Sequence, residues 1–435
     1  MILKMLSVPS NARNAWITVS APADGRVLGT LPMHSPDRVQ AVVSCLRETQ
    51  VLWRSMGVVG RAKWLTKFRD WLLGNEDMVV GSLAAETGKP VAAAYREFRI
   101  GIDALDYHRT RGAEFLESRR VRTGGVPNAS LQLAIAQRPC AVVGVISSWV
   151  YPLAAALFEV IPALLSGSAV VVKPSSVTPL TMRALVIGWA ELGAPPVLDF
   201  VTGHEAGPAL VDAVDFVHFS GSPETGKVIA LRAAARLIPC RLELGGKSSA
   251  VVLTGVDIGR AAAGIALGGL AGSGQSCSCI ERVFVESPIY DAFIDRLVDE
   301  VDAFGAQDPD DTTVEVMTSA AHVIQVKNQV EDAVKRGAVV RAGGHGSGHI
   351  FAPTVLVDVD PAMSVLTQQT LGPVLPVVRV ADAEQAIALA NDPYGPCASV
   401  WTTDGPAGSY VCGRLTAARV AVNDVSVHLT PMLHV

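Results

Sequence analysis

The most constraining feature of this 435-residue sequence is an alternation of short apolar runs with longer amphipathic segments that begins at Val142. The short runs have the length of strands, and apolar residues recur in the longer segments at helical spacing. This alternation is typical of a parallel sheet covered by helices on both faces. The predicted strands are residues 142–146, 169–172, 198–201 and 216–219, and the predicted helices are residues 154–165, 180–192, 206–213 and 226–236.

A second series of the same kind follows Glu243. It predicts strands at 250–253, 283–286, near Val339, near Val355 and at 374–380, and helices at 258–268, 290–301 and 323–336. Before the first series, residues 64–72, 78–86 and 92–115 are predicted to be helical and 131–136 extended. No repeat or low-complexity linker separates the two series, so we predict two α/β domains.

The apolar stretch at 140–172 has the length of a membrane span, with Glu159 as its only charged residue. Pro152, Pro162, Gly144 and Gly167 interrupt this stretch. A buried strand, a helix and a second strand explain these interruptions better than a membrane span does.

Composition narrows the class of protein. Hydrophobic residues make up 49% of the chain and charged residues 18%, which favours a compact globular protein. The net charge of −5 and the single short basic cluster, Arg119, Arg120 and Arg122, argue against binding to nucleic acid. Seven cysteines, with no apolar signal segment before Ile17, are expected to be reduced thiols of a cytoplasmic protein. No cysteine pair has zinc-site spacing, so no metal site is predicted.

Three polar, glycine-containing stretches follow predicted strands, at residues 146–152, 172–176 and 219–226. In an open α/β sheet, ligands bind beyond the carboxyl ends of the strands. Glycines at 219–226 would let a ligand approach the backbone, and the start of the following helix favours a phosphate. Each stretch alone is weak evidence for a nucleotide, because many such turns are rich in glycine.

Two further stretches carry groups that could react. Cys277 follows the loop Gly-Ser-Gly-Gln-Ser, and a cysteine at a helix start there could be held as an activated thiolate. Glu243 begins Glu-Leu-Gly-Gly-Lys and could take a proton from the thiol or from water. Taken singly, Cys277 could equally be a small buried thiol, and Glu243 a solvated surface residue.

In order and spacing, these stretches resemble the aldehyde dehydrogenase superfamily. The most specific motifs are Gly-Gln-Ser-Cys ending at Cys277 and Glu-Leu-Gly-Gly-Lys from Glu243. The likeness extends to Asn423 through residues 22–25, 86–90, 352–356, 371–374 and 391–395. Within the family, residues 277–282 look most like those of succinate-semialdehyde dehydrogenases.

The resemblance implies a Rossmann-type NAD(P)-binding domain at 1–244, with a hairpin at about 122–139 that serves oligomerisation. It implies an α/β catalytic domain at 245–423 that carries the nucleophile. Family members continue past this point, so residues 424–435 are expected to be a truncated segment without the C-terminal oligomerisation strand. A homo-oligomer is expected if another element takes the place of that strand. Without such an element the sheet edge would be uncovered, which would lower solubility.

The resemblance also implies a mechanism. Cys277 would attack a small-molecule aldehyde, which the subfamily likeness narrows to a semialdehyde, and Glu243 would activate the water that hydrolyses the resulting thioester. NAD or NADP would be the cofactor. The residues expected to bind it are Ile146, Ser147, Trp149, Lys173, Ser175, Ser176, Gly207, Phe219, Ser220, Gly221, Ser222, Thr225, Gly226, Leu244, Gln369 and Leu371.

Four positions depart from the family pattern. Val150 stands where the family has an asparagine that donates to the oxyanion, and losing one such donor typically costs about 10²–10³ in rate. Ser176 replaces a glutamate common in NAD-preferring members, which makes NADP plausible. Gln369 replaces a glutamate that holds a ribose, and Leu371 replaces a phenylalanine.

Alternatives follow from these departures. The chain could be a catalytically impaired relative that binds nucleotide or acts as a regulatory protein. A cysteine hydrolase without a cofactor would use the same thiol and carboxylate but would leave Lys173 without a role. Cys279 could form a reversible disulfide with Cys277 or could simply pack in the core, and Arg282 could bind a substrate carboxylate or be structural.

Overall fold

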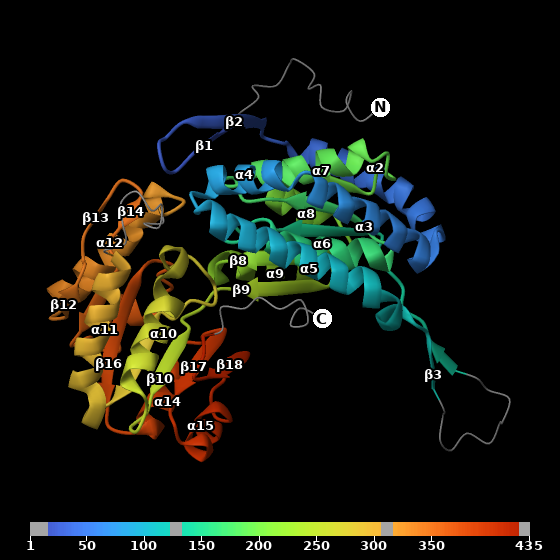
Figure 1. Cartoon of the computed structure of the whole chain (residues 1–435). Coiled ribbons are helices and arrows are strands. Elements are labelled where there is room, and N and C mark those ends of the chain that lie inside the picture. The colour runs from blue at the N-terminus through green and yellow to red at the C-terminus, as the bar shows by residue number, and fades with distance from the viewer. Residues whose placement is uncertain (1–15, 122–132, 306–315, 426–435) are drawn as a thin grey trace.

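A computed structural model describes residues 16–121, 133–305 and 316–425. Within these residues the chain forms two α/β units that lie side by side (Figure 1). The first unit, blue to green, is built on a five-stranded sheet, and the second, yellow to red, on a seven-stranded sheet. The predicted α/β class with parallel sheets is confirmed.

The five-stranded sheet has the order β7-β6-β5-β8-β9, and all its pairs are parallel. Its strands are β5 (Val142–Ile146), β6 (Ala169–Lys173), β7 (Leu198–Phe200), β8 (Phe216–Gly221) and β9 (Cys240–Leu244). β5 is buried along its whole length because helices cover both faces of the sheet. β9 was not predicted, since this partly buried edge strand carries charged residues and lacks an apolar run.

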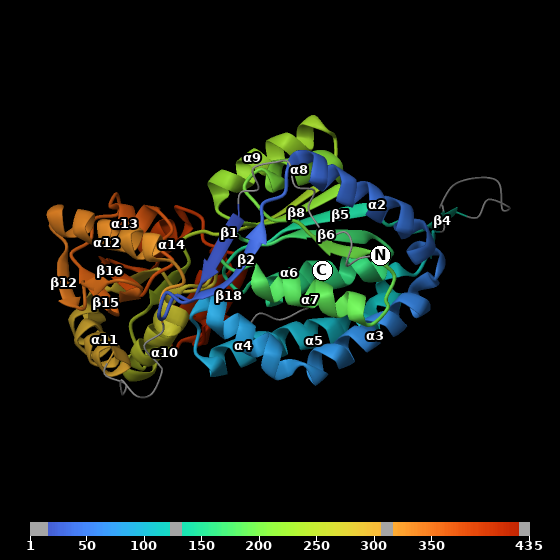
Figure 2. The same ribbon diagram turned by 90° about the horizontal axis from the view of Figure 1, so that it is seen from above.

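Helical layers cover this sheet (Figure 2). On one side lie α2 (Pro36–Ser55), α8 (Ala206–Ala213) and α9 (Pro223–Ala235), and on the other lie α6 (Ala154–Ser166) and α7 (Leu180–Glu191). An outer layer of α3 (Gly57–Gly74), α4 (Glu76–Thr87) and α5 (Val91–Leu116) packs against α6 and α7. The apolar stretch at 140–172 therefore holds β5, α6 and β6. No helix in the described part of the chain is long and apolar enough to cross a membrane.

The seven-stranded sheet has the order β12-β15-β16-β11-β10-β17-β18, and only β12 is antiparallel to its neighbour. The strands are β10 (Ser249–Val252), β11 (Arg282–Glu286), β12 (Val339–Ala342), β15 (Thr354–Val357), β16 (Val374–Val380), β17 (Cys397–Trp401) and β18 (Arg419–Val422). The predicted sheet, which closed at residues 374–380, was incomplete. β17 and β18 extend it beyond β10, and long-range pairing, not a local pattern, places them there.

Helices cover both faces of this second sheet. One apolar core lies beneath α10 (Ile258–Leu270) and α11 (Tyr290–Gly305). The other core lies beneath α12 (Ala320–Lys335), α13 (Ser364–Thr367), α14 (Ala383–Asn391) and α15 (Gly405–Cys412). Two short 3₁₀ helices, η1 (Ala271–Gly274) and η2 (Ser287–Ile289), flank β11 in sequence.

Three two-stranded hairpins complete the described chain. They are β1 (Trp16–Ser20) with β2 (Val27–Pro32), β3 (Arg119–Val121) with β4 (Leu133–Ile135), and β13 (Gly346–Ser347) with β14 (Ile350–Phe351). β3 projects away from the body of the molecule beyond α5 (Figure 1). Most of the predicted hairpin at 122–139, and the C-terminal segment from residue 426, lie outside the described residues. The domain boundaries and the oligomerisation element therefore stay predictions.

Candidate active site

The three polar stretches meet at one edge of the first sheet. Each follows the carboxyl end of a strand, β5, β6 or β8, and these neighbouring strands are parallel. Ile146 pairs with Lys173 on one side and with Phe219 on the other, so all three stretches begin at the same level. The edge is the place where an open α/β sheet binds its ligand.

At this edge, two polar groups lack partners among the residues that the structure describes. The Lys173 ammonium is largely buried and makes no hydrogen bond or ion pair with a described residue, and burial lowers its pKa. The Ser147 hydroxyl is buried and also has no hydrogen-bond partner among the described residues. Gly207 lies against the aliphatic part of Lys173, because a Cβ on Gly207 would lie 4.0 Å from Lys173 Cδ. A ligand with hydroxyl groups would satisfy both polar groups.

The start of α9 forms the second part of this edge. Ser222 caps the helix by accepting a hydrogen bond from the Thr225 N–H at 3.3 Å. A Cβ on Gly226 would lie 2.5 Å from Leu244 Cδ2, so this predicted glycine allows the close contact between α9 and the end of β9. The N–H groups at the start of this helix could bind a phosphate.

Glu243 lies on the edge strand β9, not in a turn. It is in register with Ser220 of β8, which places it beside the polar stretch at 219–226. The carboxylate forms an ion pair with Arg241 at 3.1 Å, and both side chains are partly exposed. Glu159 lies beneath them on α6, 3.2 Å from His218 Nδ1, and burial raises the pKa of Glu159 to about 7.

Cys277 lies in a turn between η1 and β11, so the predicted helix start is wrong. Three consecutive residues before it, Gly272, Ser273 and Gly274, have positive φ angles. A Cβ on Gly274 would lie 2.3 Å from the Gly372 oxygen, so only glycine lets these two loops approach. The compact loop, not a helix dipole, therefore positions the thiol.

The surroundings of Cys277 do not favour a thiolate in the cofactor-free protein. Burial raises the pKa of the thiol, and the positive charge of Arg419 and the negative charge of Glu243 act on it in opposite directions. The prediction of an activated thiolate is thus contradicted, because desolvation outweighs Arg419. The same interaction shows that Glu243 of the first unit lies close to the thiol of the second.

A buried ion pair joins the loops around the site. The Lys247 ammonium, in the Glu-Leu-Gly-Gly-Lys motif, lies 2.7 Å from Glu281 and donates to Thr370 Oγ1 at 2.6 Å. Glu281 also accepts the N–H groups of Thr370 and Leu371. Lys247 and Glu281 are buried and find their hydrogen-bond partners within this network. The network therefore holds the end of the Cys277 loop against the loop at residues 368–371.

Gln369 and Leu371 are therefore held beside the site. A Cβ on Gly245 would lie 2.2 Å from Gln369 Oε1, so the amide packs directly on the strand end that carries Glu243. The Leu371 carbonyl lies 3.0 Å from His322 Nε2. The His322 ring makes an edge contact with Trp149, at 5.6 Å between ring centroids. The predicted residues Trp149 and Leu371 thus approach each other through His322, which sequence reasoning missed.

The remaining predicted positions are local to their loops. The Ser175 hydroxyl accepts a hydrogen bond from the Val177 N–H at 3.2 Å, and Ser176 is partly buried in the same turn. Val150 is buried, and its N–H donates to Ser148 Oγ at 3.1 Å. Cys279 is buried with its sulfur 3.9 Å from the Ala271 oxygen, and the disulfide switch stays a prediction.

Arg282 is structural. Its guanidinium donates to the carbonyl oxygens of Lys247, Leu389, Ala390, Asp392 and Pro393, and its side chain is fully buried. It is therefore not placed to bind a substrate carboxylate. Arg419, which the sequence analysis did not select, is the arginine whose charge reaches the nucleophile. No local signal marks it, since it comes to the site only through the pairing of β17 with β18.

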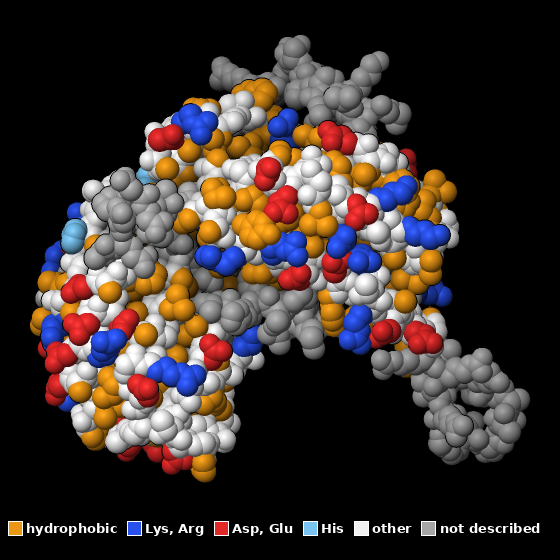
Figure 3. All heavy atoms as spheres, viewed as in Figure 1, with side chains coloured by type: hydrophobic (Ala, Val, Ile, Leu, Met, Phe, Trp, Pro, Cys, Tyr) orange, Lys and Arg blue, Asp and Glu red, His pale blue; other side chains and the backbone are white. Residues whose placement is uncertain are grey.

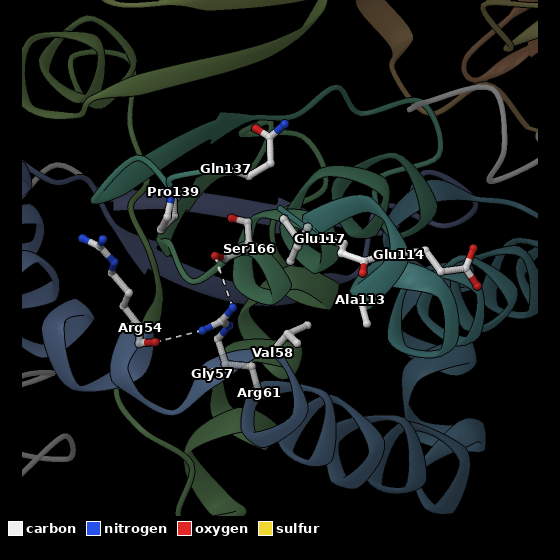
Figure 4. A pocket seen from close by; sticks show the side chains of 11 residues that line it. Arg54, Gly57, Val58, Arg61, Ala113, Glu114, Glu117, Gln137, Pro139 and Ser166 are labelled. Carbon is white, nitrogen blue, oxygen red and sulfur yellow. Dashed lines mark hydrogen bonds between the residues drawn. The ribbon is translucent and has the colours of Figure 1, made fainter. Parts of the chain in front are cut away.

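A separate pocket of about 640 Å³ lies among α3, α5 and the end of α6 (Figure 4). It holds none of the predicted site residues. Arg61 on its wall already donates to the oxygens of Arg54, Leu165 and Ser166. On the molecular face shown in Figure 3, acidic and basic side chains are interspersed without a continuous basic track.

Comparison with known proteins decides the family. The model of the aldehyde dehydrogenase family matches residues 8–434. The chain belongs to this family. It is 34% identical to 4,4'-diapolycopene aldehyde oxidase of Methylomonas sp, over 94% of this chain and 78% of that protein. It is 33% identical to a putative succinate-semialdehyde dehydrogenase [NADP(+)] of Mycobacterium ulcerans, over 94% of this chain and 80% of that protein.

Solved structures of family members have the same fold. An NAD-dependent aldehyde dehydrogenase from Sinorhizobium meliloti superposes with a TM-score of 0.91 at 32% identity, covering 98% of this chain and 86% of that one. The NADP complex of an NADP-dependent glyceraldehyde-3-phosphate dehydrogenase from Bacillus halodurans gives 0.90 at 30% identity, covering 95% and 88%. The expected resemblance and the aldehyde dehydrogenase-like fold are confirmed, and this family member is an enzyme of aldehyde oxidation.

Proposed function

We propose that this family member oxidises an aldehyde to the carboxylate with Cys277 as nucleophile and Glu243 as general base. One observation carries the proposal. The two groups come from different sheets, yet they lie close enough for the charge of Glu243 to act on the Cys277 thiol. A thiol and a nearby carboxylate from two different units are the pair that covalent catalysis followed by hydrolysis requires.

The residues at the edge of the first sheet suit a dinucleotide. Lys173 and Ser147 offer unpartnered polar groups for ribose hydroxyls, and the start of α9 offers N–H groups for the pyrophosphate. We propose that these groups hold NAD or NADP together with Trp149, Gln369 and the turn at 219–226. When bound, the nicotinamide takes up the hydride that leaves the aldehyde carbon.

The chain's own residues supply the other steps. Cys277 Sγ forms a bond to the carbonyl carbon after its proton passes to a base, and the loss of hydride leaves a thioester on the sulfur. Glu243 then takes a proton from water, the hydroxide adds to the thioester carbon, and the carbon–sulfur bond breaks. The ion pair between Arg241 and Glu243 holds the carboxylate in place at 3.1 Å between steps.

Cofactor preference rests on Ser176 and on the relatives. A carboxylate at this position would repel a 2′-phosphate, and serine removes that charge. The mycobacterial relative is named for NADP(+), and the Bacillus neighbour was solved with NADP. We therefore propose NADP as the better cofactor, with NAD also accepted.

A second candidate is the impaired relative that binds nucleotide with little turnover. Val150 favours it, because its buried side chain cannot donate to an oxyanion. The intact thiol and carboxylate favour the active enzyme, so we rank the impaired form second.

The test is an aldehyde panel with NAD and with NADP. Wild type should form reduced cofactor, while Cys277→Ala should form none and Glu243→Gln should stall after a burst that leaves the thioester on the enzyme. Val150→Asn should raise kcat by up to about 10²-fold. No turnover by soluble wild type and by Val150→Asn with every aldehyde would overturn the proposed activity. Equal rates for wild type and Val150→Asn would show that another donor serves the oxyanion.

A further inference from the structure

Four polar side chains form a cluster around the proposed general base in the first unit. They are Glu243 and Arg241 on β9, His218 on β8 and Glu159 on α6. Arg241 is in register with His218, and partners in register point to the same face of a sheet, as do alternate residues along a strand. His218, Arg241 and Glu243 therefore share the face on which Glu159 lies 3.2 Å from His218 Nδ1. We call these four residues the Arg241 cluster.

The cluster contains two carboxyl groups but only one guanidinium. Arg241 forms an ion pair with Glu243 at 3.1 Å, and more than a third of each of these two side chains is exposed. Glu159 is more enclosed, since 11% of its side chain is exposed and only 3% of the neighbouring His218. The Arg241 charge lowers the pKa of Glu159, and the Glu243 charge raises it. The same guanidinium thus acts on both carboxyl groups.

The enclosed carboxyl group changes its charge near neutral pH. Burial raises the pKa of Glu159 to about 7, so a large fraction of it is protonated in neutral solution. Among the described residues, the charged or titratable groups that act on it are His218, Arg241 and Glu243. α3 and α5, which also pack against α6, contribute none of the charges that shift its pKa. A buried Glu159 carboxylate would therefore need Arg241, which the resting protein pairs with Glu243.

We propose that Glu159 is a positioning residue that takes over Arg241 when Glu243 accepts a proton from the hydrolytic water. The proposal rests on the proposed function, because it describes the movement of charge that accompanies the step assigned to Glu243. A carboxylate held by a guanidinium is a weaker base, because the cation favours the charged form. A second partner for Arg241 offsets this loss of basicity.

The proton movements of this exchange balance within the cluster. An O–H bond of water breaks, its proton binds the Glu243 carboxylate, and the hydroxide adds to the thioester carbon. Arg241 then pairs with Glu159, whose own proton passes to His218 Nδ1, 3.2 Å away. The net charge of the cluster rises by one as the hydroxide brings one negative charge to the thioester. The reverse transfers restore the pair between Arg241 and Glu243.

A first test needs neither cofactor nor turnover. In infrared difference spectra of the cofactor-free protein, the carbonyl band of protonated Glu159, assigned by its loss in Glu159→Gln, should disappear with a midpoint near pH 7. Glu243→Gln, which frees Arg241, should lower this midpoint by about one to two pH units. Arg241→Met should raise the midpoint, and Glu243→Gln should shift it much less in that background. Arg232→Met, which breaks a surface ion pair with Asp212, is the control and should leave the midpoint unchanged.

Two results of the infrared titration would overturn the proposal. One is an equal effect of Glu243→Gln with and without Arg241, because Glu243 would then act on Glu159 through its charge alone. The other is the absence of a titrating Glu159 band, because Glu159 would then have no proton to lose when Arg241 reaches it.

A second test follows the two chemical steps separately in rapid-mixing experiments. Reduced cofactor reports the formation of the thioester, and mass spectrometry of the quenched enzyme reports the decay of the acyl group on Cys277. Glu159→Gln should slow this decay about tenfold and leave thioester formation unchanged, because the amide cannot become a counter-ion for Arg241. In an Arg241→Met background, Glu159→Gln should have no further effect.

The kinetic outcomes separate this proposal from the proposed function. Independent effects of Glu159→Gln and Arg241→Met on the decay, or equal slowing of both steps, would mean that Glu159 is only structural and would overturn the proposal. Failure of wild type to form reduced cofactor or a thioester with any aldehyde would contradict the proposed function instead. The infrared titration would then still decide whether Arg241 is shared between the two carboxyl groups.

Discussion

At Cys277, several opposing environmental effects set the proton affinity of the thiol. Burial raises its pKa and is the largest effect, Arg419 lowers it, and Glu243 raises it further. The surroundings of Cys277 therefore favour the protonated thiol over the thiolate, because desolvation penalises the charged form. If Glu243 is the general base that we propose, its charge has two effects, since it can receive a proton and it also opposes the ionisation of the Cys277 thiol.

This proton affinity predicts the pH dependence of alkylation. In the cofactor-free enzyme, the rate of Cys277 modification by neutral iodoacetamide should rise about tenfold per unit between about pH 7 and pH 9, because only the thiolate reacts and its fraction grows with pH below the pKa. Mass spectrometry of the Cys277 peptide measures the rate. A plateau that begins below about pH 8 would contradict the prediction and would mean that Arg419 outweighs burial.

At the scale of elements, the site depends on loops that buried polar groups hold together. Lys247 and Glu281 are each only 2% exposed at the side chain, so neither can turn to solvent if its partner is lost. Through Thr370, the pair also fixes the loop that presents Gln369 and Leu371. The lysine of the Glu-Leu-Gly-Gly-Lys motif thus has a structural function, while the role that we propose for the glutamate of the same motif is chemical.

Removal of one member of the Lys247–Glu281 ion pair should therefore destabilise the folded protein more than removal of both members. Glu281→Leu leaves the Lys247 ammonium buried and unpaired, and should lower the free energy of unfolding by about 3–5 kcal/mol. The double variant Lys247→Met/Glu281→Leu should recover part of that loss, because no buried charge remains. Urea unfolding followed by fluorescence measures both. A single variant within about 1 kcal/mol of wild type would show that the pair is not desolvated as described.

At the scale of the whole molecule, neither unit by itself contains all the residues of the proposed site. The first provides Glu243 and the polar edge of its sheet, and the second provides Cys277, Gln369 and Arg419. Contacts between the units include the Thr318 hydroxyl, which donates to the Thr87 oxygen at 2.7 Å, and the edge contact between Trp149 and His322. A dinucleotide bound between Lys173 and Gln369 would contact both units.

Such binding should stabilise the folded chain without any chemistry. In Cys277→Ala, NADP at about 100 times its Kd should stabilise the protein by about 2.7 kcal/mol and raise the thermal midpoint. Differential scanning fluorimetry measures the shift, with nicotinamide alone as a control that lacks the phosphates. Absence of a shift with NADP and with NAD would rule out the cofactor site and favour the cysteine hydrolase.

Much of the site could be predicted from the sequence, because its residues lie in short motifs at strand ends. Lys173, Ser222 and Glu243 fall where local patterns and the family resemblance place them, and the structure brings them to neighbouring strands. His322 and Arg419 could not be predicted in this way. Each lies in an ordinary helix or strand, and its nearness to the site arises from contacts between distant elements.

The sequence by itself determined the α/β class and the family, and it selected the thiol and the carboxylate that we propose as catalytic, because apolar periodicity and motif spacing are local properties of the chain. Only the tertiary structure decided that the Arg282 guanidinium is bound to backbone oxygens, and that burial raises the pKa of the Cys277 thiol. Charge and solvation depend on which distant groups surround an atom in space, and that arrangement exists only once the sheets have paired and packed.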